Sequence, residues 1–340
     1  MKAVGLLKYL PIEDEESLFD VELPKPRATG RDLLVKVKAV SINPVDVKVR
    51  SPKSKTEEQP KILGWDASGV VVETGEDCHD FQVGDEVYYS GSLIRPGTYS
   101  EFHLVDERIV GKKPHTLTFA ESAALPLTSI TAWEALFDRL AIEASDKENN
   151  KQKTILIIGG AGGVGSIAIQ LAKWAGLTVI ATASRQSTSD WVKELGADFV
   201  MNHHHSFQEQ LKQHGMENVD FILCLNNTDQ HWLAMADAIK PQGMICSIVE
   251  NAQPLDLNVL KNKSATFVWE FMFTRTMYET EDMEKQQQLL NQLSELIDIG
   301  VIKTTLKKTL SPIHAENIRK AHALVESGKT IGKIVLEDFA

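Results

Sequence analysis

The sequence predicts an α/β protein with two domains, one rich in β-strands and one doubly wound about a parallel sheet. The first observation is a series of short strands before residue 125, separated by turn residues. The second is a regular alternation of strands and helices between residues 154 and 271. The third is a length of 340 residues, which is more than one hydrophobic core commonly supports.

The first domain begins with segments rich in β-branched and aromatic residues. These segments predict strands at residues 2–7, 32–40, 69–74, 85–90 and 99–105. The polar stretch 50–60 and the stretch 92–99 are expected to be loops that shape a substrate pocket. A helix follows, because Ala132, Leu136 and Leu140 recur at helical spacing.

The second domain is predicted from strands and helices of regular length. Strands are expected at 154–159, 178–183, 198–202, 219–225, 243–249 and 266–271, and helices at 164–176, 189–196, 206–215 and 231–239. Such alternation implies a parallel sheet with right-handed crossovers. Helices at 281–300 and 313–328 and a strand at 332–337 are expected to return to the first domain. The predicted domains are therefore 1–126 with 274–340, and 127–273.

The most informative motif lies in "ILIIGGAGGVGSIAIQ". Gly160, Gly162 and Gly165 fit the pattern G-x-G-x-x-G, with Gly163 and Val164 inside it, directly after a buried strand and at the start of a helix. Such glycines allow a tight turn, close approach of a pyrophosphate and close helix–strand packing. The motif predicts a dinucleotide site, and a turn that serves packing alone is the alternative.

The end of the second strand distinguishes between two dinucleotides. An NAD site is expected to place Asp or Glu there, whereas this chain has Ser184 and Arg185. A guanidinium pairs well with a 2′-phosphate, so the sequence favours NADP(H). A solvated surface charge is the alternative for Arg185. The ends of the later strands should also line the cofactor site, namely at Asn202, Leu225, Asn226 and Val249.

Composition excludes several classes of protein. The formal net charge of −11, with scattered acidic residues, disfavours nucleic-acid binding. The 3 cysteines are too few and too far apart for a disulfide framework. No apolar run is long enough for a membrane span or a signal peptide. We therefore expect a cytoplasmic protein with neither nucleic-acid nor membrane partners.

Several segments in order along the whole chain resemble one family. They are "SINPVD", "ILGWDASGVV", "VGDEVY", "GTYSEF", "LPLTSITAWEAL" and "GKIVL". The chain thereby resembles the quinone oxidoreductase-like branch, also called zinc-type alcohol dehydrogenase-like, of the medium-chain dehydrogenase/reductase superfamily. The resemblance implies a GroES-like catalytic domain, a Rossmann coenzyme domain, a cleft between them and a homodimer or homotetramer. It also implies NADPH-dependent reduction of quinones or α,β-unsaturated carbonyl compounds.

The residues that match the zinc ligands of this superfamily are of the wrong type. Asn43, Trp65 and Pro126 stand where the zinc enzymes carry Cys, His and a third Cys or acid. The region 90–115 contains no cysteine, so the structural zinc lobe is also missing. Three successive histidines at 203–205 point in different directions and are expected to form a surface turn. We expect no zinc.

The resemblance also suggests roles for residues around the reacting groups. Asn43 is expected to hydrogen-bond near the nicotinamide or the substrate oxygen, and Asp46 either acts there or orients the local turn. Thr128 is expected near the nicotinamide. Lys333 either approaches the cofactor or is an exposed strand charge. Tyr99 is a candidate proton donor.

Two other functional classes remain open from the sequence. The protein could be an alcohol dehydrogenase or an enoyl-thioester reductase of the same superfamily. It could also be a non-catalytic NADPH sensor or an RNA-binding protein, although the net negative charge disfavours RNA.

Overall fold

The computed structural model describes residues 1–339, which form two compact units. The first unit contains Met1–Ile130 and the chain from Phe273 onward, and the second contains Thr131–Met272. The predicted boundaries, 126/127 and 273/274, lie near these divisions. The segment 127–130 belongs to the first unit, where the Leu127 amide donates to the Asp66 carboxylate over 2.7 Å.

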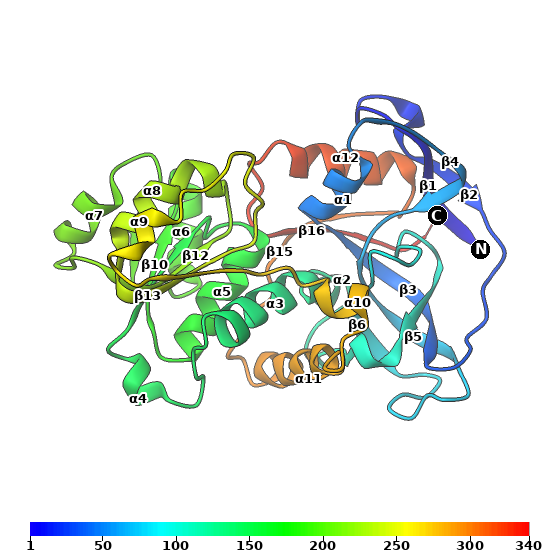
Figure 1. The fold of residues 1–340 in the computed structure, drawn as a ribbon. Helices are drawn as coiled ribbons and strands as arrows, with labels where there is room; N and C mark the ends of the chain where they lie inside the picture. Colours follow the sequence, from blue (N-terminus) through cyan, green and yellow to red (C-terminus); the bar gives the residue numbers. More distant parts are fainter. Residues whose placement is uncertain (340) are drawn as a thin grey trace. The chain divides into compact units, whose positions relative to one another are not determined.

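The first unit contains two sheets (Figure 1). Its strands are β1 (Lys2–Tyr9), β2 (Phe19–Glu22), β3 (Asp32–Ile42), β4 (Lys53–Ile62), β5 (Asp66–Thr74), β6 (Glu86–Ser90), β7 (Phe102–Asp106), β8 (Val110–Lys112), β15 (Leu306–Leu310) and β16 (Lys333–Glu337). The three-stranded sheet has the order β2-β1-β4. The seven-stranded sheet has the order β15-β16-β3-β5-β6-β8, and β7 also pairs with β3.

One expected loop of the first unit is a strand. Most of the stretch 50–60 forms β4, which pairs antiparallel with β1 through irregular registers. The loop prediction was wrong because β4 is largely exposed and polar, so it lacks the apolar alternation of a half-buried strand. The Tyr9 hydroxyl on β1 donates to the Glu57 carboxylate on β4, which adds a side-chain link.

The helices of the first unit frame these sheets. They are α1 (Pro44–Arg50), α2 (Phe119–Ala123), α3 (Pro126–Trp133), which continues into the second unit, α10 (Thr274–Tyr278), α11 (Lys285–Asp298), α12 (Ala315–Glu326) and the 3₁₀ turns η1 (Glu15–Ser17) and η2 (Glu107–Ile109). The helices expected at 281–300 and 313–328 are α11 and α12. The C-terminal segment contributes β16, which pairs with β3 of the same unit.

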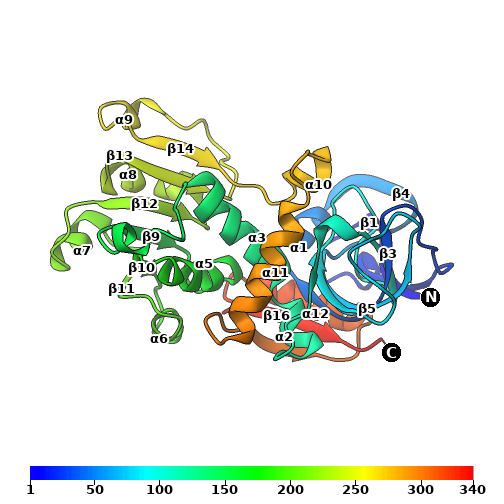
Figure 2. The ribbon, with the colours of Figure 1, turned by 90° about the horizontal axis from the view of Figure 1, so that it is seen from below.

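The second unit is a parallel six-stranded sheet with the order β11-β10-β9-β12-β13-β14, visible in Figure 2. Its strands are β9 (Thr154–Ile158), β10 (Thr178–Thr182), β11 (Phe199–Met201), β12 (Val219–Cys224), β13 (Ile239–Ser247) and β14 (Thr266–Trp269). Its helices are α4 (Lys147–Asn150), α5 (Gly163–Trp174), α6 (Gln186–Glu194), α7 (Phe207–Gln213), α8 (Thr228–Ala238) and α9 (Asn258–Lys261). This order, 3-2-1-4-5-6 along the chain, is that of a Rossmann sheet, so the predicted fold class is confirmed.

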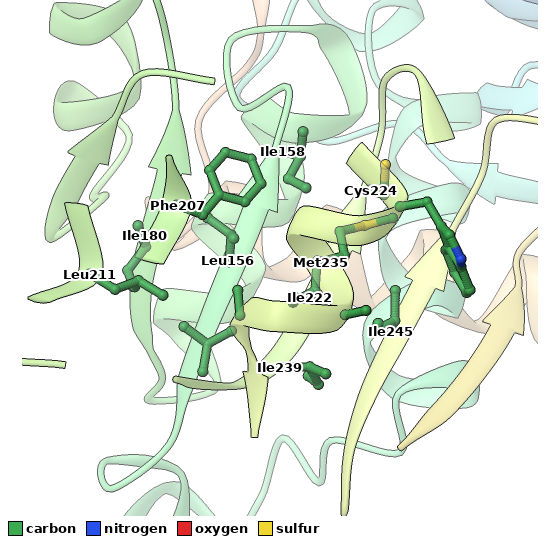
Figure 3. Close-up of a cluster of buried hydrophobic side chains, with 14 of the residues drawn as sticks. Leu156, Ile158, Ile180, Phe207, Leu211, Ile222, Cys224, Met235, Ile239 and Ile245 are labelled. Atoms are coloured by element: carbon green, nitrogen blue, oxygen red, sulfur yellow. The ribbon is translucent and has the colours of Figure 1, made fainter. Parts of the chain in front are cut away.

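A hydrophobic core lies between this sheet and two of its helices (Figure 3). Leu156, Ile222 and Ile245 project from adjacent strands, and they pack with Leu211 of α7 and Met235 of α8. All five side chains are buried, which explains why the strands are nearly continuous apolar runs in the sequence. Within residues 1–339, no helix is both long enough and apolar enough to cross a membrane.

The helix expected around residues 132–140 changes its winding. The α-helix α3 ends at Trp133, and a π-helical segment, η3 (Glu134–Arg139), follows it. The Leu140 amide donates to the Ala135 carbonyl, a bond to the fifth preceding residue. Periodicity alone indicates a helix here but does not reveal this wider turn.

Candidate active site

Asn43 begins a short helix at the end of a central strand of the first unit. β3 ends at Ile42, Asn43 is the N-cap of α1, and Pro44 occupies the first helical position. Asp46, at the third helical position, accepts a hydrogen bond of 2.7 Å from the Asn43 amide. This capping interaction supports the interpretation of Asp46 as the residue that orients the turn.

Asp66 connects three separate segments of the first unit. Its Oδ1 accepts from the Leu127 amide over 2.7 Å, and its Oδ2 accepts from the Asn43 side-chain amide over 2.8 Å. The Lys333 ammonium lies 3.4 Å from the same Oδ2. Since Asp66 is fully buried, these donors replace the water that an exposed carboxylate would bind.

Lys333 enters this site from the C-terminal strand. β16 pairs antiparallel with β3, with Ile334 opposite Ile42, and this register brings the Lys333 side chain to the end of β3. Its ammonium donates to the Ile42 carbonyl over 2.8 Å and to the Asn43 side-chain oxygen. The alternative of an exposed strand charge is therefore wrong. Burial lowers the pKa of Lys333 and raises that of Asp66, while their mutual attraction opposes both shifts. We call Asn43, Asp66 and Lys333 the polar cluster.

Next to the polar cluster, a second set of buried polar side chains is linked by hydrogen bonds. The Tyr99 hydroxyl lies 3.1 Å from Asp46 Oδ2 and 3.1 Å from His322 Nε2. Burial is the main cause that raises the pKa of Asp46 to about 7. Tyr99 is fully buried, and that burial raises its pKa well above the ordinary value. Its hydroxyl is within hydrogen-bond distance of both Asp46 and His322. The structure therefore does not support a proton-donor role for Tyr99, which instead links helices α1 and α12.

The glycine turn of the second unit connects β9 to the N-terminus of α5. Gly162 is the N-cap of this helix and provides no capping side chain. A Cβ atom on Gly165 would come within 3.0 Å of the carbonyl oxygens of Gly159 and Gly160, so this glycine is needed for packing. A Cβ on Gly162 would meet only the Gly159 oxygen, at 3.6 Å, so the space beside it is open. Gly163 and Val164 form the first turn of α5. An open glycine at a helix N-terminus fits a pyrophosphate.

The other predicted cofactor-binding residues of the second unit lie after its strands. Ser184 and Arg185 are exposed between β10 and α6. Asn202 follows β11, and its amide donates to the Gln210 side-chain oxygen over 2.7 Å. The remaining residues follow β12 and β13 at the same edge of the sheet, namely Leu225, Asn226 and Val249. The parallel register thus gathers the predicted residues at the carboxyl ends of neighbouring strands.

Thr128 lies on α3 in the first unit rather than in the second unit. Its side chain is buried, and the hydroxyl donates to the Leu125 carbonyl over 3.0 Å within the same helical region. The hydroxyl proton is therefore used within this helical region, and the expected position of Thr128 near a nicotinamide stays a prediction.

The chemistry of the polar cluster does not fit a catalytic zinc ion. An ammonium group donates into the Asn43 oxygen and lies beside the Asp66 carboxylate, where a zinc ligand set would need free electron pairs. The Trp65 ring nitrogen donates to the Ser92 carbonyl over 3.1 Å and cannot ligate a metal. Within residues 1–339, no three His, Cys, Asp or Glu side chains gather as a metal-binding group.

Sequence reasoning missed two residues that organise the first unit's site. Asp66 is a single charged residue inside the apolar stretch "ILGWDASGVVV", and an acid in such a run is itself a signal of a buried polar site. His322 lies on α12, and burial lowers its pKa to about 3. Nothing in its helical sequence context distinguishes it from a surface histidine.

The fold and these two site regions define an α/β protein with a β-rich unit and a Rossmann-type unit. Residues 29–115 match the family model for the alcohol dehydrogenase GroES-like domain, and residues 195–336 match that for a zinc-binding dehydrogenase. A zinc-type alcohol dehydrogenase-like protein of Staphylococcus aureus is 44% identical over 337 residues, covering 99% of each chain. The chain belongs to the zinc-type alcohol dehydrogenase-like proteins of the medium-chain dehydrogenase/reductase superfamily.

Solved structures agree with this assignment. A candidate zinc-dependent alcohol dehydrogenase of Rhizobium etli is 52% identical with a TM-score of 0.95, covering 100% of this chain and 98% of that chain. The Escherichia coli quinone oxidoreductase in complex with NADPH is 25% identical with a TM-score of 0.83, covering 99% of this chain and 100% of that chain. The protein is thus an oxidoreductase of this superfamily.

Proposed function

We propose that the protein is an NADPH-dependent reductase of quinones or activated α,β-unsaturated carbonyl compounds that works without zinc. The observation that carries the proposal is the polar cluster, in which Asn43, at the position of a zinc-ligand cysteine, accepts a hydrogen bond from the Lys333 ammonium beside Asp66. The quinone oxidoreductase similar to this chain binds NADPH, which supports the same cofactor here.

The second unit offers the groups that a dinucleotide phosphate needs. The open space beside Gly162 and the N-terminus of α5 suit a pyrophosphate. Arg185 is exposed, and residues 183–189 contain no Asp or Glu that would repel a 2′-phosphate. When bound, NADPH supplies the hydride, and the protein orients the reactants and excludes water.

The polar cluster supports a particular class of acceptor. The side-chain oxygen of Asn43 accepts from Lys333 and its nitrogen donates to Asp66, so the amide is held rigidly. None of the three groups acts as a Lewis acid in this arrangement. Quinones and activated enones suit such a site, because their reduction places charge on a delocalised oxygen that water can protonate, whereas a simple ketone needs stronger polarisation.

A screen of acceptors with metal analysis on the same sample tests this function. We expect oxidation of NADPH with ortho- or para-quinones or enones, at a rate that a chelator leaves unchanged. Dependence on added zinc, or a preference for secondary alcohols, would contradict the proposal in favour of an alcohol dehydrogenase. A preference for enoyl thioesters would identify the other enzymatic alternative. Tight NADPH binding without turnover of any acceptor would indicate a sensor, and retention of RNA on filters at moderate salt would indicate RNA binding.

We also propose a homodimer or homotetramer that acts on small molecules. The strand β14 lies at the edge of the second unit's sheet, and Trp269 and Phe271 near it are 43% and 48% exposed. Exposed apolar side chains at a strand edge favour association with another copy. Light scattering after size-exclusion chromatography should give a mass above 37.8 kDa, the mass of one chain.

A further inference from the structure

Buried hydrogen bonds join helix α6 to the glycine turn of the second unit. The Trp191 indole nitrogen on α6 donates to Ser166 Oγ on α5 over 2.9 Å. The Ser166 hydroxyl in turn donates to the Gly162 carbonyl over 2.7 Å. We call this connection, from Trp191 through Ser166 to Gly162, the α6 link. It ends on the backbone of the turn that is proposed to bind the pyrophosphate.

The chemistry of its members fixes the direction of both bonds in the α6 link. An indole nitrogen can only donate, so the Ser166 oxygen is the acceptor of the first bond. The Ser166 hydroxyl hydrogen is then directed to the Gly162 carbonyl, which also accepts from the Ser166 amide over 2.9 Å. Trp191 is 7% exposed and Ser166 is fully buried. Breaking the link therefore leaves a buried polar group without its partner.

Helix α6 begins at the residue that is proposed to contact the 2′-phosphate. Arg185 is the N-cap of α6, and its amide donates to Thr188 Oγ1 over 3.1 Å. The Thr188 hydroxyl donates back to the Arg185 carbonyl over 2.7 Å. Because these bonds hold the backbone of Arg185 to the first turn of α6, a displacement of the helix displaces Arg185 as well.

Gly160 shows how closely α6 packs against the glycine turn. A Cβ atom on Gly160 would lie 2.9 Å from Ala181 Cβ on β10. It would also lie 3.2 Å from Val192 Cγ1 on α6 and 3.4 Å from Ile169 Cδ1 on α5. The three elements thus meet at the turn without room for a methyl group, so the position of α6 relative to the turn is set by direct contact.

We propose that Trp191 and Ser166 are positioning residues that set the separation between Arg185 and the glycine turn, and thereby select NADPH over NADH. This inference rests on the proposed cofactor. NADPH carries a pyrophosphate and a 2′-phosphate on one ribose, whereas NADH carries only the pyrophosphate. A site that already holds its two anion-binding parts at the matching separation binds NADPH without the cost of ordering them. A loosened α6 therefore weakens NADPH binding more than NADH binding.

Isothermal titration of the full chain with NADPH and NADH tests the positioning role. The readout is the ratio of the two dissociation constants, because a general structural defect weakens both dinucleotides and leaves the ratio unchanged. Trp191→Phe keeps an aromatic ring but removes the donor, and it should reduce the preference for NADPH about 2- to 10-fold. The matched variant Trp232→Phe removes the donor of another buried indole, which bonds to the Asp256 carbonyl over 3.1 Å, and should keep the parent ratio.

Two further variants make the test independent of one substitution. Ser166→Ala breaks the α6 link at its centre, so it should reduce the preference for NADPH even if Trp191→Phe does not fold. In the Arg185→Ala background, Trp191→Phe should leave the ratio unchanged, since the contact that the link positions is already lost.

The failure of this inference differs from the failure of the proposed cofactor. If the parent prefers NADPH and both link variants keep that preference, the positioning role is wrong and the cofactor proposal stands. The same conclusion follows if Trp191→Phe lowers the ratio equally with and without Arg185. If the parent binds NADPH and NADH equally, the proposed cofactor is wrong, and the selection by the α6 link is wrong with it.

Discussion

The glycine turn of the second unit and the polar cluster of the first unit differ in how far apart their residues lie in the sequence. The turn lies within residues 159–165, so one local pattern describes it completely. The polar cluster joins Asn43 to Lys333, 290 positions apart in the chain. A local motif can be recognised before the fold is known. A long-range cluster forms only after β3, β5 and β16 have paired in their native registers.

The largest expected effect comes from breaking the long-range cluster. Lys333→Met leaves the buried Asp66 carboxylate without its cation, which should lower the free energy of unfolding by about 3–5 kcal/mol. Urea denaturation measures this loss. The matched variant Lys308→Met removes an exposed lysine from the neighbouring strand β15 and should change stability by less than about 0.5 kcal/mol. Equal losses in the two variants would show that the cluster is not what stabilises this region.

The second prediction concerns cofactor selectivity at the coenzyme unit. Arg185→Ala should weaken NADPH binding by about 1.5–3 kcal/mol, because a charged hydrogen bond to the 2′-phosphate is lost. NADH binding should not change. Isothermal titration with both dinucleotides measures the difference, and Lys193→Ala, on an exposed position of α6, is the control. If NADPH and NADH lost affinity equally, Arg185 would not be contacting the 2′-phosphate.

The third prediction separates the two tasks of the glycine turn. Gly165→Ala should destabilise the protein by about 1–3 kcal/mol, because its Cβ overlaps fixed backbone oxygens. Gly162→Ala has room for its Cβ, so it should fold normally but bind NADPH more weakly, since the methyl group fills the space that the pyrophosphate needs. Thermal unfolding and titration with NADPH measure the two effects. The interpretation fails if Gly162→Ala binds NADPH as tightly as the parent.

The last prediction concerns the titration of Asp46. Because burial raises its pKa to about 7, the folded state holds a proton that the unfolded state has lost above about pH 4. Its contribution to stability is therefore fully present below about pH 4 and decreases as the pH rises to about 7, by at most about 1.4 kcal/mol per pH unit. Asp46→Asn should remove this part of the pH dependence in urea denaturation at pH 4.5–8. The exposed control Asp77→Asn should keep it; an unchanged profile in Asp46→Asn would contradict the assignment.

The same contrast explains what the sequence could predict. The Rossmann sheet was predictable because its strands are apolar runs and its helices have regular length, so local patterns reflect burial on both faces. The candidate cofactor site followed, since parallel strands bring their carboxyl ends to one edge. The strand β4 was missed, because an exposed polar strand has no apolar alternation. Asp66 and His322 were missed as site residues, because their partners come from other segments of the chain.

The position of β16 has a consequence for biosynthesis. This strand inserts between β15 and β3, and it brings Lys333 to Asn43 and Asp66. On the ribosome, residues 131–272 emerge before β16 exists, so the coenzyme unit can fold as soon as it is synthesised. The first unit, although its first strand is made earliest, needs nearly the whole chain to complete its seven-stranded sheet. We therefore expect translation that stops before residue 333 to leave the second unit able to fold and the first unit without its β16 strand.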